Sequence, residues 1–534
     1  MSGSEASRAI VRMATNYLRL GLNLALGVTL VRVLIGWIGA DAMALILLIV
    51  AGAGFGMMFR ELSNRTAVRE LGAAHHSGDR ERFLRVFNSA LLVSGVAAVL
   101  AGVVFAGLFL YLPNMKMPDS LRPAAPALVI GQGLYIVLAT AFSPVFNMFS
   151  VTERFVAYNF WTLAERACQL TAALWLQHVT SITSSAEGVR AYGYLVAGLQ
   201  AAVFVVPVGW LMLSDPRLRP RPSRVGGAEI RELSRTLGWY FAVELASSLH
   251  ERVGALIMNA YFALLGNIVF GLALQFTSYV RQATQGVTFG LDAVSARFST
   301  DKNKSLSVLL THSTRLHGLV AFPAGLVMAA LAHPLIQLWV GGKPDITPEI
   351  IDRTALTVQI MSVALTSRAI SDGWMMILYG AGFLRVYAPL VLVGAMFNPA
   401  ITLGTLWSIP QGGIEQNVGF YANPIVFSAV YTTVHFVILP VVAARCLKVR
   451  YAEVFSPLAR PLLATLATSA LVGPLVWLGW RSYPHWNVWM IGASLALFAA
   501  VYGLIASAVV LTEQERARFV WPLARRFGLG PRGA

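Results

Sequence analysis

Ionisable side chains inside long apolar segments are the residues of this sequence that could do chemistry. The segment Trp239–Tyr261 is long and apolar enough to cross a bilayer, yet it contains Glu244, His250, Glu251 and Arg252. A charge near the middle of a bilayer costs at least about 2.5–3.5 kcal/mol, so it usually faces a bundle interior or a wet cavity. Glu244 and Glu251 share one helical face. The segment therefore predicts a helix that lines a polar cavity.

Composition explains how such charges can be tolerated. Of the 534 residues, 57% are hydrophobic and only 12% are charged, and the mean hydropathy is +0.65. A soluble chain of this length could not hide that much apolar surface, whereas a bilayer can solvate it. The net charge of +16 would indicate nucleic acid in a soluble protein, but here the basic residues lie mostly in short loops between apolar segments. We therefore expect no nucleic-acid partner, and contact with anionic membrane lipid.

The apolar segments predict an all-α polytopic membrane protein with about 14 transmembrane helices. Each segment is roughly long enough for a hydrocarbon core of about 30 Å. Their approximate limits are 14–37, 42–60, 87–112, 124–149, 158–178, 190–213, 237–261, 266–292, 312–340, 354–380, 387–408, 420–444, 461–480 and 486–511.

The distribution of basic residues predicts the orientation of these spans. With the N-terminus and every second loop placed in the cytoplasm, 29 of the 41 Lys and Arg residues fall on the cytoplasmic side, six on the other side and six inside spans. Cytoplasmic loops of membrane proteins carry the excess of Lys and Arg. We therefore expect both termini in the cytoplasm.

Two loops six spans apart carry the same pattern, S-x-D-[RK]-x-[RK]-x-L-x-V. It occupies residues 77–86 and 299–308, an offset of 222 residues, and Arg32 and Arg252 are offset by a similar 220. Six is an even number of spans, so the two copies of the pattern have the same orientation in the membrane. The pattern therefore predicts two parallel halves, and transporters built from paired halves commonly bind cargo between them.

The repeat gives four predicted regions. They are an N-terminal lobe of six spans at 1–213, a C-terminal lobe of six spans at 214–450, two added spans at 451–511 and a basic cytoplasmic tail at 512–534. The tail mixes arginines with large apolar residues, which suits either a helix on the inner leaflet or a solvated basic segment.

Several local patterns resemble one transporter family. They are Arg69-Glu70-Leu71 with Ser77-Gly78-Asp79, the run from Arg231-Glu232-Leu233 through Glu251-Arg252-Val253 to Asn267–Gly271, Leu338–Gly342, and Tyr379–Arg385. Together they make the chain similar to the polysaccharide exporters, or O-antigen flippases, of the multidrug/oligosaccharidyl-lipid/polysaccharide superfamily. The resemblance covers nearly the whole chain, and the final two spans are its least distinctive part.

The resemblance implies a flippase in the bacterial cytoplasmic membrane. Its substrate would be an undecaprenyl-diphosphate-linked oligosaccharide for cell-surface polysaccharide synthesis, moved by alternating access. Two pseudo-symmetric six-helix lobes would face a central cavity, and other polysaccharide-assembly proteins would be partners. Such transport involves no bond cleavage and no cofactor.

The resemblance also implies that arginines of the cavity hold the lipid diphosphate. A guanidinium stays charged and offers phosphate a planar, bidentate donor set. Six arginines lie inside spans, and Arg19 is close enough to its helix end to reach the membrane surface instead. Asp372 follows Arg368 by one turn, which also permits a structural ion pair. The expected substrate-binding residues are Arg252, Arg281, Arg32, Arg166 and Arg368.

Acidic residues inside or near the spans have two interpretations. Glu244, Glu251 and Asp292 could bind a coupling proton or sodium ion, or they could neutralise Arg252 and Arg281 when no substrate is bound. We favour charge neutralisation.

Three alternative functions remain open. A multidrug antiporter of the same superfamily handles cations and should show a cavity dominated by carboxylates. A membrane glycosyltransferase or O-antigen ligase should carry a sizeable outer loop or an acidic metal motif, and a scaffold needs no polar interior. The sequence has no D-x-D, Gly-rich phosphate loop, zinc-ligand pattern or nucleophile elbow, and only two cysteines. It therefore predicts no catalytic residue, metal site or cofactor.

Overall fold

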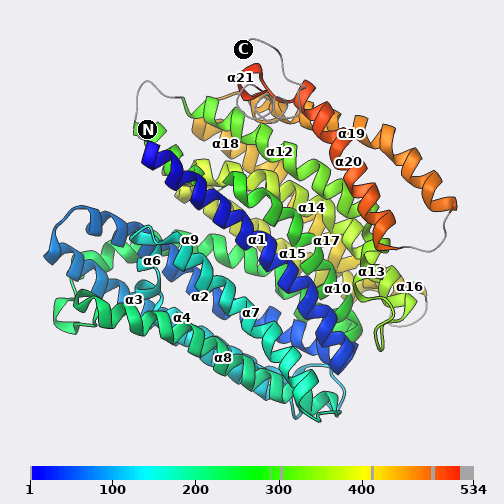
Figure 1. The fold of residues 1–534 in the computed structure, drawn as a ribbon, viewed down its shortest axis with the longest axis horizontal. Helices are drawn as coiled ribbons and strands as arrows, with labels where there is room; N and C mark the ends of the chain where they lie inside the picture. The colour runs from blue at the N-terminus through cyan, green and yellow to red at the C-terminus, as the bar shows by residue number, and fades with distance from the viewer. Residues whose placement is uncertain (1–2, 289, 301–304, 410–413, 483–486, 517–534) are drawn as a thin grey trace. The chain divides into compact units, whose positions relative to one another are not determined.

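The computed structural model describes residues 3–288, 290–300, 305–409, 414–482 and 487–516 and contains helices but no strand within them (Figure 1). The α-helices, in chain order, are α1 (Gly3–Ile38), α2 (Ala40–His76), α3 (Arg80–Tyr111), α4 (Ala125–Ala141), α5 (Ser143–Phe146), α6 (Met148–Val151), α7 (Phe155–Val179), α8 (Ser185–Ser214), α9 (Gly227–Glu251), α10 (Val253–Thr288), α11 (Leu291–Thr300), α12 (Leu306–Ala330), α13 (Ala332–Val340), α14 (Pro348–Gly380), α15 (Leu384–Ser408), α16 (Ile414–Phe420), α17 (Ala422–Thr433), α18 (Leu439–Leu447), α19 (Tyr451–Ser482), α20 (Val488–Val509) and α21 (Glu513–Glu515). Short 3-10 turns are η1 (Leu112–Asn114), η2 (Pro216–Leu218) and η3 (Pro222–Arg224), and η4 (Val434–Ile438) is a π-helical turn.

The helices confirm an all-α polytopic membrane protein, but they do not confirm the count of 14 spans. Among the described residues, nine helical stretches are long and apolar enough to cross a membrane, or up to eleven if each of two bent pairs is one span. The lower count arises partly because α9 and α10 form one continuous stretch, Gly227–Thr288. In addition, α7 and α14 do not meet that criterion of length and hydropathy, although both lie at predicted spans.

Two predicted spans are bent. The α4–α5 pair bends by 62° before Pro144, and the α12–α13 pair bends by 69° at Leu331. A proline has no N–H to continue the helical ladder and its ring clashes with the preceding turn. Pro144 lies in the first turn of α5, and Pro334 lies in the first turn of α13. These prolines explain why each span divides in two.

The span predicted at 237–261 is also interrupted. Helix α9 ends at Glu251, and α10 begins at Val253 after Arg252, a turn residue whose backbone angles (φ −108°, ψ −37°) stay in the helical region. Within α10, Ala263 has φ 51° and ψ −146°, which breaks the helix where the sequence predicts the loop between two spans. Both interruptions lie close to polar side chains that are described below.

The chain forms two compact units. Unit 1 comprises Met1–Gln275, Trp339–Thr357 and Leu384–Val430, and unit 2 comprises Phe276–Leu338, Val358–Phe383 and Tyr431–Ala534. Helices α10, α14 and α17 each continue from one unit into the other. The lobe boundaries inferred from the sequence stay a prediction.

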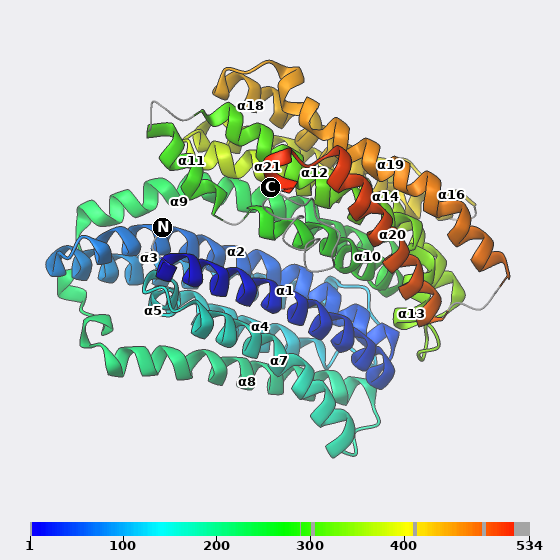
Figure 2. The ribbon, with the colours of Figure 1, turned by 45° about the horizontal axis from the view of Figure 1, so that its top comes forward.

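Unit 1 depends on close helix crossings. Helix α2 packs against α3, α4 and α9, and α4 packs against α8 (Figure 2). A Cβ on Gly131 of α4 would lie 2.4 Å from the carbonyl oxygen of Gly193 on α8, so the two backbones touch. Small residues permit this approach in membranes, where packing replaces the hydrophobic effect between helices.

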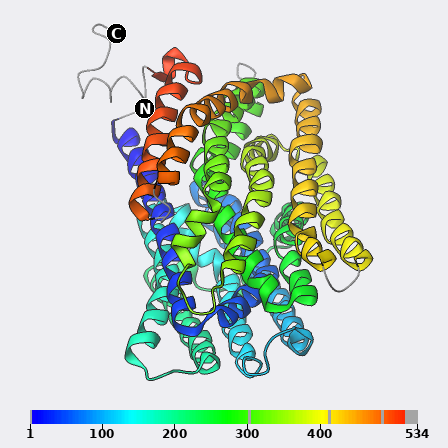
Figure 3. The same ribbon diagram turned by 90° about the vertical axis from the view of Figure 1, so that its right-hand side faces the viewer.

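In unit 2, α12 packs against α19, and α19 packs against α20. Helices α19 (orange) and α20 (red) run side by side in Figure 3. Beyond α20, a capping box begins α21, in which the Thr512 side chain accepts from the Glu515 backbone N–H and the Glu515 side chain accepts from the Thr512 N–H. The Glu515 carboxylate also pairs with Arg315 on α12. The rest of the predicted basic tail, 517–534, lies outside the described residues.

Candidate functional site

A buried ion pair joins α2 to α7 in unit 1. The Nη1 and Nη2 atoms of Arg60 each donate to one carboxylate oxygen of Glu165 at 3.0 Å, and Nη1 also donates to the Tyr135 hydroxyl on α4 at 2.8 Å. The two charged side chains are only 11% and 17% exposed. We call Arg60, Tyr135 and Glu165 the N-terminal charge cluster. Such planar two-point pairing is both strong and directional.

Further contacts from α4, α7 and α8 surround this cluster. The Arg60 guanidinium lies 5.4 Å from the centre of the Tyr135 ring and 5.9 Å from that of Phe204 on α8. Gln200, also on α8, donates to the Glu165 backbone carbonyl at 3.4 Å. Four helices therefore meet around one arginine, which is a structural role whatever else the arginine does.

A second buried cluster lies in unit 2 and contains more cations than carboxylates. Arg281 of α10 donates to Asp372 of α14 at 3.0 Å, and Arg368, one turn before Asp372, approaches its other oxygen at 2.9 Å. The side chains of Arg368 and Asp372 are 5% and 11% exposed, and that of Arg281 is 31% exposed. One carboxylate thus serves two guanidinium groups, and Arg281 is the more accessible of the two.

His435 completes this second cluster from the π-helical turn η4. Its Nε2 lies 3.2 Å from Arg368 Nη1, and its Nδ1 lies 2.7 Å from the Ser371 hydroxyl. A guanidinium can only donate, so Nε2 must accept and the imidazole is neutral with its proton on Nδ1. We call Arg281, Arg368, Asp372 and His435 the C-terminal charge cluster. With His435 neutral, these four side chains carry a net charge of +1.

Arg252 lies at the break between α9 and α10. A Cβ on Gly54 of α2 would lie 1.2 Å from Arg252 Nη1, so the guanidinium rests directly on the backbone of α2. The carboxylates that act on it most strongly are Glu251, Glu244 and Glu61. The Arg252 guanidinium therefore occupies the space that a side chain at position 54 would fill.

The remaining predicted site residues are more dispersed. Arg32 on α1 and Arg166 on α7 have exposed side chains, while Glu244 and Glu251 on α9 are half-buried. Asp292 lies in the first turn of α11, where a Cβ on Gly380 of α14 would meet its carbonyl oxygen. Arg281 is paired with Asp372, and its neutralisation by Glu244, Glu251 or Asp292 stays a prediction.

The structure brings together Arg281 and Arg368 of the predicted site and adds Asp372, whose pairing with Arg368 the sequence allowed. It also reveals Arg60, which the charge count had placed with the following cytoplasmic loop although it lies within the span Ala40–Asn64. A signal for Arg60 was present: it precedes Arg281 by 221 residues, between the two repeat offsets of 220 and 222. The two clusters thus centre on arginines at matching places in the predicted repeat.

Solved transporter structures share this fold. A structure of the lipid II flippase MurJ in an inward closed conformation matches 93% of this chain and 98% of its own, with a TM-score of 0.67 and 10% sequence identity. An inward-facing multidrug resistance MATE transporter of the MOP superfamily matches 82% of this chain and 98% of its own, with a TM-score of 0.63 and 12% identity. A mutant of the Vibrio cholerae MATE transporter VcmN matches 85% and 99%, with a TM-score of 0.56 and 11% identity. No protein-family model and no curated protein matches the sequence.

These likenesses define the class of fold. The chain has the transporter fold that MurJ and the MATE proteins share, in a multi-pass α-helical membrane protein. At 10–12% identity the likeness concerns the fold, and the cargo has to be argued from the charged residues of this chain.

Proposed function

We propose that this protein is a flippase that moves an undecaprenyl-diphosphate-linked oligosaccharide across the bacterial cytoplasmic membrane by alternating access. The product would serve cell-surface polysaccharide synthesis, both termini would be cytoplasmic, and no covalent bond would be broken. The observation that carries the proposal is the C-terminal charge cluster, in which the buried guanidinium of Arg368 and the partly exposed guanidinium of Arg281 share one carboxylate. Ionisable side chains within membrane spans are costly and commonly mark the pathway of a substrate or ion.

Arg281 is the proposed contact of this cluster with the lipid diphosphate. It is the more exposed of the two arginines, and Asp372 keeps Arg368 as a partner when Arg281 turns to a substrate. A diphosphate accepts the same forked hydrogen bonds that Asp372 accepts now. When no substrate is bound, the Asp372 carboxylate therefore pairs with Arg281 where the diphosphate would otherwise bind.

Arg252, Arg32, Arg166 and Arg368 are proposed as further diphosphate contacts. The charges of Glu251 and Glu244 act on Arg252 and partly balance it. These two glutamates, and Asp292, are proposed to balance charge, and a coupling proton or sodium ion is their second proposed role. The side chains of Arg32 and Arg166 are exposed.

Transport in cells tests this proposal. Deletion of the gene should cause undecaprenyl-linked glycan to accumulate on the inner face of the membrane. Complementation with Arg281→Ala combined with Arg252→Ala should reproduce the deletion at normal expression. Arg385→Ala is the matched control, because Arg385 is an exposed arginine at the start of α15, and it should restore export. Full export by the double variant would show that Arg281 and Arg252 do not bind the substrate.

A multidrug cation antiporter is the second candidate, because MATE structures share the fold. A cation site needs an excess of carboxylate, whereas the C-terminal charge cluster has an excess of guanidinium. Proton- or sodium-driven efflux of a cationic dye from vesicles that contain the purified protein would favour this candidate over the flippase.

A further inference from the structure

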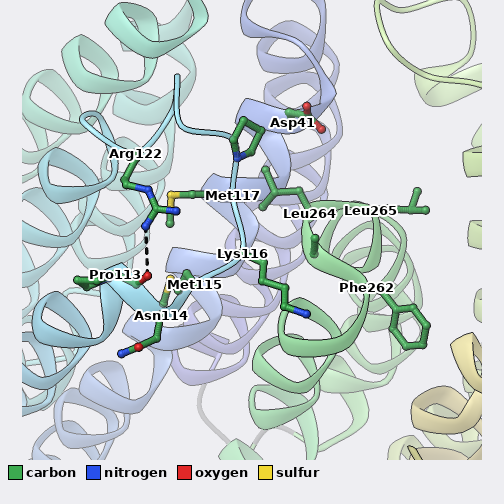
Figure 4. Close-up of a pocket in the computed structure, with 12 residues that line it drawn as sticks. Asp41, Pro113, Asn114, Met115, Lys116, Met117, Arg122, Phe262, Leu264 and Leu265 are labelled. Atoms are coloured by element: carbon green, nitrogen blue, oxygen red, sulfur yellow. Dashed lines mark hydrogen bonds between the residues drawn. The ribbon is translucent and has the colours of Figure 1, made fainter. Parts of the chain in front are cut away.

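Hydrogen-bonding groups from two helices of unit 2 converge on the imidazole of His317 in α12, a residue that is 0% exposed. The polar groups of the hollow beside the loop that follows α3 do not converge in this way. That hollow is lined mainly by apolar residues, and its Lys116 side chain points away from Asp41 (Figure 4). Histidine is the side chain whose charge ordinarily changes near neutral pH, so a buried imidazole with partners on both nitrogens can bind a proton.

The contacts of His317 define where its protons can lie. Nδ1 lies 2.8 Å from the Ser313 backbone carbonyl oxygen, which can only accept, so Nδ1 carries a proton. Nε2 lies 3.0 Å from the Thr288 hydroxyl of α10, and that hydroxyl lies 3.2 Å from the Thr284 carbonyl oxygen. A hydroxyl has one hydrogen to donate.

The direction of this hydroxyl therefore follows the charge of His317. When His317 is neutral, Thr288 donates to Nε2. When Nε2 also carries a proton, it donates to the hydroxyl oxygen, and the hydroxyl donates to the Thr284 carbonyl instead. Rotation of one hydroxyl group thus satisfies the ring in both charge states, and Thr288 is half-buried, so it can pass a proton to the buried ring.

His435 of the C-terminal charge cluster does not offer the same possibility. Its Nε2 faces the Arg368 guanidinium at 3.2 Å, and a guanidinium can only donate. A second proton on His435 would therefore meet a cation and no acceptor. Of these two buried histidines, His317 is the one with an acceptor for a proton on each ring nitrogen.

The His317 ring lies beside the carboxylate of the C-terminal charge cluster. A Cβ on Gly373 of α14 would lie 2.7 Å from His317 Cε1 and 2.8 Å from Nδ1, so the ring rests on the backbone of the residue that follows Asp372. The charge of Asp372 acts on His317. Because Arg281 and Arg368 share this carboxylate, a proton on His317 adds a third cation to its surroundings.

Other ionisable groups of α12 and of the helices packed against it are directed elsewhere. On α12 itself, Arg315 and His312 approach Glu515. Tyr502 of α20 donates to the Leu319 carbonyl at 2.7 Å. The remaining groups are half-buried or exposed, and they are Asp292 and Arg297 of α11 and Glu453 and Arg460 of α19. The C-terminal charge cluster therefore supplies the charges that face the imidazole.

We propose that His317 is a proton-binding site whose occupancy controls how tightly the C-terminal charge cluster binds an anionic ligand. The inference rests on the proposed flippase function, and it adds that the lipid diphosphate is bound together with a proton. A proton taken from water onto Nε2 offsets part of the negative charge of Asp372, so Arg281 is released more readily to the diphosphate. The coupling is reciprocal, because Asp372 attracts the proton more strongly once Arg281 has turned to the diphosphate.

Proton uptake on ligand binding tests this inference. The probe is farnesyl diphosphate, titrated by calorimetry into the purified full-length protein in detergent, in buffers of different ionisation enthalpy. The parent protein should take up more protons per bound diphosphate than His317→Gln, by about one proton at most. Comparison with the variant cancels the protons that the diphosphate itself exchanges. As pH rises from about 6 to 8, the affinity of the parent should fall relative to that of the variant by at most about tenfold per pH unit, the linkage of one proton.

Two further variants separate proton binding from a structural role. Thr288→Val keeps the imidazole and removes the hydroxyl that accepts from protonated Nε2, so it should also reduce proton uptake. His178→Gln is the matched control, because His178 is an exposed histidine in the last turn of α7, and it should keep the proton uptake of the parent.

The possible failures are distinguishable. Binding of the diphosphate with equal proton uptake and equal pH dependence in the parent and in His317→Gln overturns the proton site and leaves the flippase proposal intact. An equal loss of affinity at every pH in His317→Gln and Thr288→Val shows a structural role and also overturns the site. Absence of binding by the parent protein overturns the diphosphate as ligand and the inference with it, and the export assay on Arg281 and Arg252 judges the flippase independently.

Discussion

A carboxylate shared by two guanidinium groups is the most informative feature at the scale of single residues. Asp372 holds Arg281 and Arg368 at about 3 Å, and neutral His435 accepts from Arg368 on its other side. Together these four side chains carry one net positive charge. By contrast, Arg60 and Glu165 balance each other completely. The first arrangement suits a binding site, and the second suits a structural pair.

The Arg60–Glu165 pair gives the prediction at this scale. Glu165→Gln should destabilise the protein by about 3–5 kcal/mol, because it leaves a buried guanidinium without its counter-charge. Replacing both residues, Arg60→Met with Glu165→Leu, should recover most of that loss. Thermal unfolding of the detergent-solubilised variants measures both effects as a double-mutant cycle.

The pair formed by Arg85 and Glu229 is the control for this cycle. It has a similar distance, 3.1 Å, but its arginine is 45% exposed, so breaking it should cost less than about 1 kcal/mol. If Glu165→Gln proved as mild as Glu229→Gln, the N-terminal charge cluster would not be the rigid centre of four helices that its geometry describes.

At the scale of elements, broken helices place the polar groups. Arg252 occupies the gap between α9 and α10, Ala263 interrupts α10, and His435 lies in a π-helical turn. Irregular backbone inside a membrane protein is tolerated where it is buried in protein or lines a cavity. The irregular positions therefore fit a backbone that is buried in protein or lines a cavity.

Gly54 tests the placement of Arg252. Gly54→Ala would put a methyl group on the guanidinium and should displace Arg252, so export should fall as far as it does in Arg252→Ala. Gly72→Ala is the control on the same helix, because nothing lies within 4 Å of its Cβ position. Normal export by Gly54→Ala, in a protein that is expressed normally, would show that export does not require Arg252 to lie against Gly54.

The attachment of α21 should depend on pH. Burial raises the pKa of Glu515, but its hydrogen bonds with Thr512 and the charges of Arg315 and His312 outweigh burial and hold this pKa below its ordinary value of 4.5. A lowered carboxyl pKa stabilises the folded contact above the ordinary value, and the contact is lost as pH falls through the lowered pKa. We expect the amide protons of 512–516 to be protected from exchange at neutral pH and to lose this protection in acid.

Glu515→Gln is the variant that isolates this contact. It should remove the protection at neutral pH without affecting α12, which bears Arg315. Hydrogen exchange detected by mass spectrometry reports both segments in one experiment. Equal protection of 512–516 in the variant and the parent protein would show that the carboxylate does not hold α21.

At the scale of the whole molecule, the topology is the property open to a direct test. The distribution of Lys and Arg predicts cytoplasmic termini, and alternation then assigns the loops that follow the first, third and seventh predicted spans to the outer side. A phosphatase fused after Asn114 should be active outside the inner membrane, whereas one fused after Ser223 should be inactive. The opposite pattern would reverse the predicted orientation.

The sequence by itself determined the class of the protein, because hydropathy and the clustering of basic residues in loops are local properties that a bilayer reads directly. It also located Arg252, Arg281 and Arg368 inside apolar spans. It did not predict the bend at Leu331 or the break at Arg252, since a hydropathy window does not register the direction of a helix axis.

Only the tertiary structure decided which charges meet. Asp372 lies 91 residues from Arg281, and Glu165 lies 105 residues from Arg60, so neither pair follows from spacing along one helix. The gap over Gly54 that accommodates Arg252 likewise depends on how α2 packs against its neighbours. Helical periodicity fixes the face on which a side chain lies, but the helix opposite that face is chosen by packing of the whole chain.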